Sequence, residues 1–171
     1  MFDVSRLEAV ETTAFREMFL ATPVDARERL GLSVVDVGKS TVLRCRAVDH
    51  PQFNRVLGMG VHGVPSREEI DTVANLFREN GSRNAFWQLV PGVEPPADLG
   101  LGPRRRWLKV VRDGDPVQAS GSDLQAAVVE RADADAWGEL VCAAFGMPPI
   151  VAPLAAAAVA RRIPLLLGAR R

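Results

Sequence analysis

Residues 54–81 restrict the fold of this chain more than any other stretch. An apolar run leads into three closely spaced glycines, Gly58, Gly60 and Gly63, and a helix pattern follows them. A strand, a glycine-rich turn and a helix in this order form the local arrangement that lets backbone N–H groups meet a phosphate. This segment is therefore the centre of the predicted fold, and the other elements are placed around it.

The helix within this segment has signals at both ends. Ser66 and Glu69 have the spacing of a capping box. The apolar residues that should face the core recur at helical spacing: Ile70, Val73, Ala74 and Phe77. Asn80 and Gly81 provide the left-handed position at which many helices end. We expect a helix from Ser66 to this pair.

Two further helices are predicted at the start of the chain. Ser5 and Glu8 also have capping-box spacing, so the first helix should begin there and run to about residue 20. Its predicted buried face consists of Leu7, Val10, Ala14 and Met18, broadened by Phe15 and Phe19. Pro23 and Gly31 bracket a short second helix, whose charged residues indicate a mostly solvated surface.

Five segments have strand patterns. They cover residues 32–37, 41–48, 55–61, 84–90 and 107–112. In the second of these, apolar residues alternate with arginines, which predicts one apolar face and one wet face. Helices at the front and strands that follow, with one helix between them, predict an α/β (α+β) fold or a three-layer domain.

A polar segment rich in small residues divides the chain. Residues 113–123, DGDPVQASGSD, are typical of a linker, so we predict a first domain at residues 1–112 and a separate segment at residues 124–171. The segment should contain two helices, and the first should bury Trp137, Leu140, Val141 and Ala144. Its 48 residues are too few for a stable core. They must pack on the first part, pair with another chain in a homo-oligomer, or begin a domain that continues.

Composition narrows the possible partners. Twenty-one basic and 21 acidic residues cancel, so no overall field favours nucleic acid or acidic lipid. The longest apolar run, residues 150–160, is well short of the ~20 residues that span a bilayer, and a cytoplasmic protein is expected. Cys45 and Cys142 lie in apolar patterns, which predicts buried reduced thiols. Two Cys and two His in unrelated places predict no metal site.

Two phosphate-binding patterns overlap at the glycines. G-x-G-x-x-G is the dinucleotide fingerprint, but that site also needs an acidic residue about 20 positions later, and residues 81–86 contain none. R-x-x-G-x-G, formed by Arg55, Gly58 and Gly60, needs only amides at a helix N-terminus to hold a coenzyme A pyrophosphate. Five residues, 61–65, separate this motif from the helix. The alternative is therefore that the glycines are small residues in a twisted or bulged strand.

Residues 54–81, followed by AFWQLVPG and a strand at Trp107, resemble the GCN5-related N-acetyltransferase (GNAT) superfamily. They are most similar to bacterial members with two such domains in tandem, in which the acetyl-CoA motif of the first domain is often altered or lost. VVERADADAWGELVCAAFGMPP resembles the beginning of the second domain. The resemblance implies an acyl-CoA N-acyltransferase-like fold, a mixed β-sheet flanked by helices.

The resemblance also implies a reaction, the transfer of an acetyl group from acetyl-CoA to an amine, with Arg55, Gly58 and Gly60 as cofactor-binding residues. A general base would remove the amine proton, and imidazole is suited to this near neutral pH, which makes His50 and His62 candidates. Members of the superfamily commonly use a tyrosine as general acid, but this chain contains none. The alternative is a degenerate or truncated, non-catalytic module that binds a ligand or a partner.

Overall fold

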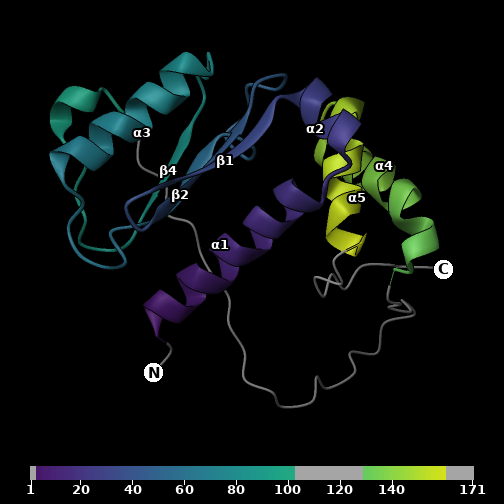
Figure 1. The fold of residues 1–171 in the computed structure, drawn as a ribbon, viewed down its shortest axis with the longest axis horizontal. Coiled ribbons are helices and arrows are strands. Elements are labelled where there is room, and N and C mark those ends of the chain that lie inside the picture. The colour runs from purple at the N-terminus through teal and green to yellow at the C-terminus, as the bar shows by residue number, and fades with distance from the viewer. Residues whose placement is uncertain (1–2, 103–128, 161–171) are drawn as a thin grey trace.

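The computed structural model describes residues 3–102 and 129–160. Within these ranges the helices and strands follow one another in a mixed α/β order (Figure 1). The elements are α1 (Val4–Ala21), α2 (Val24–Leu30), β1 (Leu32–Val37), β2 (Ser40–Cys45), β3 (Arg55–Met59), α3 (Arg67–Glu79), β4 (Phe86–Leu89), α4 (Ala134–Phe145) and α5 (Ala152–Ala160). Three short 3-10 turns complete the order: η1 (Ala97–Leu99), η2 (Arg131–Asp133) and η3 (Pro149–Val151).

The four strands form one mixed sheet in the order β1-β2-β3-β4. The first three strands are antiparallel neighbours, and β4 runs parallel to β3. Helix α3 makes the crossover between these two parallel strands, as a parallel connection requires. The α/β prediction is confirmed at the level of this mixed sheet and its helices. The predicted strand at residues 107–112 lies outside the described residues.

Helices cover both faces of the sheet, so the described part of the fold has three layers. Figure 1 shows α1 and α3 on opposite sides of the strands. The core on the α1 side contains Phe19, Leu30, Leu43, Cys45, Val48, Phe53, Leu57, Cys142, Val151 and Leu154. The core on the α3 side contains Val37, Val42, Val56, Met59, Val73 and Phe77.

The prediction of a wet face is wrong within β2, where α3 covers that face, although Arg46, just after the strand, is exposed. Val42, on that face, is fully buried. Arg44 is half-buried there, and its guanidinium donates to Ser33 Oγ at 2.8 Å and to the Leu76 carbonyl at 3.2 Å. Arg44 therefore lies in the alternating pattern because it connects β1 and α3, and its charge does not mark a solvent-exposed face.

The start of α1 corrects the predicted capping box. Asp3 is the N-cap, and its carboxylate accepts a hydrogen bond from the Ser5 backbone N–H at 2.9 Å. Glu8 points into the interior and is only 7% exposed. Within the predicted buried face, Val10 is wrong because it is 64% exposed, whereas Phe19 is buried as predicted.

The other early elements follow the sequence predictions closely. Both halves of the capping box at Ser66 and Glu69 are formed, and the helix they begin ends at Asn80. Gly31 caps α2 in the left-handed conformation with φ 60°. The predicted strands at residues 32–37 and 41–48 form a hairpin that turns at Gly38.

The C-terminal helices pack on the first part of the chain. Helix α4 packs against α5, and α5 packs against α1, so that Cys142 and Leu154 share a core with Phe19. The predicted buried face of α4 is shifted, because Leu140 is exposed and Gly138 and Cys142 are buried in its place. The proposed linker, residues 113–123, lies outside the described residues, so the division into domains stays a prediction.

Two further predictions can be compared with the described residues. Neither Cys45 nor Cys142 forms a disulfide, and both are buried. Among the helices of residues 3–102 and 129–160, none combines the length and the apolar character needed to span a membrane.

Replacement of Ser66 by Ala should lower the free energy of unfolding by about 1 kcal/mol, because it removes the acceptor of the Glu69 backbone N–H. Ser5→Ala is the matched control, since Ser5 has the same sequence signal without the capping role. We expect its effect to stay within about 0.5 kcal/mol. Urea denaturation of both variants measures the difference, and equal losses would contradict the assignment of the caps.

The two thiols should resist a thiol reagent in the native protein and react fully after denaturation. Burial excludes the reagent and raises the pKa of each thiol, which disfavours the reactive thiolate. Cys45→Ala and Cys142→Ala let an Ellman assay follow each thiol separately. Rapid native reaction of Cys142 would show that α4 and α5 do not cover it in solution.

Candidate functional site

The parallel strands β3 and β4 end at the glycine-rich segment, which is where ligands bind in many open α/β sheets. Arg55 pairs with Phe86 and Val56 with Trp87, but Met59 pairs with Leu89. The register therefore shifts by one residue, and Leu57 and Gly58 together lie opposite Gln88. Gly58 has φ 73°, a conformation that favours glycine in a β-bulge.

The two strands remain joined beyond this bulge. The Val90 backbone N–H donates to the Met59 carbonyl at 3.3 Å, so no opening between the strands begins at Gly58. At Gly60, with φ 89°, a Cβ atom would lie 2.5 Å from Val93 Cγ2. The space beside Gly60 is therefore filled by side chains from the segment after β4.

The N-terminus of α3 is satisfied by its own side chains. Glu69 accepts from the Ser66 backbone N–H at 2.8 Å, and Ser66 Oγ accepts from the Glu69 backbone N–H at 3.1 Å. Glu68 adds a second carboxylate to the same turn. These negative charges interact favourably with the helix dipole and oppose the approach of a pyrophosphate.

Arg55 is the most deeply buried charged side chain of this region, with 1% of its surface exposed. It points toward α1 rather than toward the glycine turn. Its Nη2 donates to Gln88 Oε1 and, at 3.3 Å, to Glu11 Oε1. The guanidinium carbon also lies 4.4 Å from the ring centroid of Phe15 and 5.5 Å from that of Phe86, which are cation–π distances.

Gln88 extends this arrangement into a network. Its amide nitrogen donates to Glu8 Oε2 at 2.9 Å and to Glu11 Oε2 at 2.7 Å. Burial lowers the pKa of Arg55, and the charges of Glu11 and Glu8 oppose that shift. We call Arg55, Gln88, Glu8 and Glu11 the buried polar cluster; it joins α1 to β3 and β4.

The structure does not bring the three residues of the R-x-x-G-x-G motif to one surface. Arg55 belongs to the buried polar cluster, Gly58 forms the bulge, and Gly60 contacts side chains of residues 90 and 93. His62 and His50 are both exposed. His50 lies before β3 and His62 after it, so the two imidazoles stand at opposite ends of that strand.

A small pocket of about 260 Å³ lies at the end of the parallel strands. Val4 and Ser5 from α1, Val61 after β3, and Val90 and Pro91 after β4 line it. Ser5 is the only one of these side chains with a polar group, so the pocket itself has neither an acid nor a base. These residues, the satisfied α3 terminus and the filled Gly60 position do not fit a pyrophosphate.

Sequence analysis missed Glu8 and Gln88. Glu8 was assigned to a helix cap, and Gln88 has no local signal apart from its position among strand residues. The one clue was at Glu8, which lies at helical spacing from Phe15 and Phe19. Among the described residues, no group of three or more His, Cys, Asp or Glu is arranged to hold a metal ion.

No protein-family model, curated protein or solved structure matches this chain.

Removal of the Arg55 charge should be strongly destabilising, because this almost fully buried side chain would lose its contacts with Gln88 and Glu11. We expect Arg55→Met to lower the free energy of unfolding by about 3 kcal/mol or more. Arg16→Met is the control, because the Arg16–Asp36 ion pair is largely exposed and should contribute under about 1 kcal/mol. Denaturant titration measures both, and a mild effect at Arg55 would contradict a structural role.

Proposed function

We propose that residues 1–112, of which the structure describes residues 3–102, form a domain of the GNAT superfamily. The support is the arrangement of the sheet: two helices lead into the antiparallel strands β1, β2 and β3, and α3 connects β3 to a parallel β4. This matches the role that the sequence resemblance gives to residues 54–81, the strand–loop–helix unit at the centre of an acyltransferase-like sheet.

We further propose that this domain is a non-catalytic module that acts in ligand or partner binding. One observation carries this proposal: β3 and β4 stay paired past the bulge, through the Val90–Met59 hydrogen bond at 3.3 Å. A pantetheine arm needs space between these strands, and the pairing leaves none. The carboxylate of Glu69 at the start of α3 adds electrostatic opposition to a pyrophosphate.

A second candidate function is acetyl transfer from acetyl-CoA to an amine, carried by a second domain that begins within residues 124–171. The observation that favours it is a repeat of helical order. The first domain opens with two consecutive helices, α1 and α2, and the described part of the C-terminal segment also consists of two consecutive helices, α4 and α5. In this case the first domain would serve as the non-catalytic half of a tandem protein.

We also propose that the chain self-associates through residues 124–171. Leu140, Phe145 and Ile150 are exposed on and just after α4, and exposed apolar side chains close together are typical of surfaces that bind other proteins. With equal numbers of acidic and basic residues in the chain, we propose no nucleic acid partner.

The non-catalytic proposal predicts that acetyl-CoA does not bind to this chain. Calorimetry with millimolar acetyl-CoA should give no binding heat, and the thermal unfolding midpoint should not rise, because only a ligand of the native state stabilises it. Coenzyme A and ADP are tested in parallel, and a difference between them separates the contribution of the pantetheine arm to binding from that of the nucleotide. Saturable stabilisation by acetyl-CoA and coenzyme A would overturn the proposal.

A further inference from the structure

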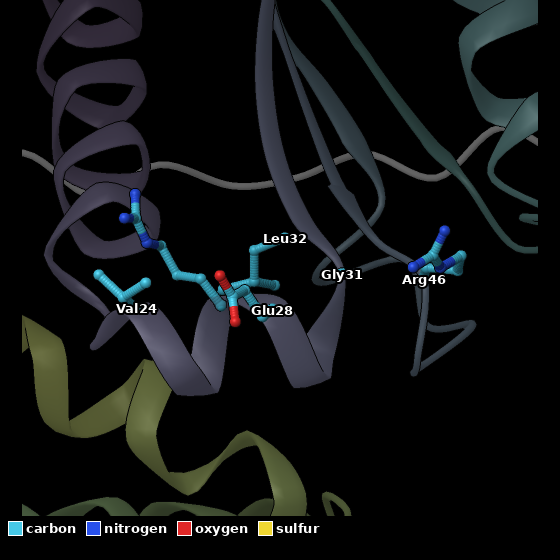
Figure 2. Close-up of a pocket in the computed structure, with 6 residues that line it drawn as sticks. Val24, Glu28, Gly31, Leu32 and Arg46 are labelled. Carbon is cyan, nitrogen blue, oxygen red and sulfur yellow. The ribbon is translucent and has the colours of Figure 1, made fainter.

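A larger pocket lies on another part of the molecule, where α2 meets the sheet. It has a volume of about 510 Å³ and is lined by Val24, Arg27, Glu28, Gly31, Leu32 and Arg46. In Figure 2, Val24 and Arg46 lie toward opposite ends of the pocket, with Glu28 and Leu32 between them. Its volume is within the range of small-molecule sites, and it shares no residue with the pocket beside β3 and β4.

The two arginines of this pocket, Arg27 and Arg46, have no ion-pair partner in the described part of the chain. The Nε–H of Arg27 is also buried without a hydrogen-bond acceptor. By contrast Arg29, two positions along α2, pairs with Asp25 at 2.8 Å. A buried donor without an acceptor costs free energy that a ligand oxygen could recover.

We propose that this pocket binds a small monocarboxylic acid with an apolar body. The Arg27 guanidinium donates to the carboxylate, and Arg46 adds a second positive charge at the other side. Val24, 60% exposed, and Leu32 offer apolar surface to the rest of the ligand. Guanidinium groups suit carboxylates, because two parallel N–H groups can meet the two oxygens.

The same pocket disfavours phosphate. Glu28 is a lining residue that forms no ion pair among the described residues, and its negative charge repels a dianion more than a monoanion. The C-terminus of α2, which ends at Gly31, adds the negative end of a helix dipole. The Gly31 backbone N–H already donates to the Glu28 carbonyl at 3.1 Å, so it is not available to a phosphate oxygen.

Benzoate is the probe for this proposal, titrated into the full chain and followed by NMR chemical shifts or calorimetry. We expect saturable binding with a Kd of about 1 mM or tighter, and no saturation with inorganic phosphate in the same range. Absence of benzoate saturation, or equal binding of phosphate, would overturn the proposal. Because the two pockets share no residue, this result and the acetyl-CoA result are independent.

Arg27→Gln should weaken benzoate binding at least tenfold. Arg29→Gln is the matched control and should bind like the parent chain, since Arg29 is already paired with Asp25. Thermal unfolding midpoints verify that each variant is folded. If Arg27→Gln does not fold, Arg46→Gln is used in its place, because Arg46 is exposed, and the same tenfold loss of benzoate affinity is expected. Unchanged affinity in the folded arginine variant would overturn the proposal. Glu28→Gln should tighten benzoate binding, and a loss of binding there would also contradict it.

Discussion

The buried polar cluster ties α1 to the sheet. Arg55 comes from β3, Gln88 from β4, and Glu8 and Glu11 from α1, so one network connects three elements. A buried charge requires its partners at short range, and displacement of α1 would strand it in a medium of low dielectric constant. Apolar burial is non-directional, whereas the hydrogen bonds of this cluster depend on distance and angle and so constrain the position of the helix.

The bulge at Gly58 changes which side chains of β3 face each of the two cores of the sheet. Arg55 and Leu57 face α1, and Val56 faces α3, in the usual alternation. Without the extra residue Met59 would also face α1, but it packs in the core on the α3 side. The left-handed conformation of Gly58 inserts the residue that reverses the alternation. A glycine that resembles part of a phosphate motif thus has a sufficient structural reason to be there.

Local signals allowed much of the fold to be predicted, and long-range contacts explain the rest. The prediction of the capping box at Ser66 was correct because both of its hydrogen bonds join residues within one helical turn. Ser5 and Glu8 carry the same signal, but Gln88, eighty residues away in the sequence, holds Glu8 in the interior. Likewise the partners of Arg55 are 33 and 44 residues away. No window of sequence around either residue contains that information.

The same distinction bears on function. The R-x-x-G-x-G motif specifies only the residues of a short segment, one cation and two glycines with free backbone conformation. Whether these reach a ligand depends on what the fold has already placed beside them. Here Glu11 holds the cation, β4 stays paired across the bulge, and Val93 occupies the space beside Gly60. Arg27 presents the opposite case: it belongs to no motif, yet its buried Nε–H has no acceptor in the described protein and lines a pocket. The two arginines show that the fold, and not motif spacing, determines which protein groups a side chain contacts.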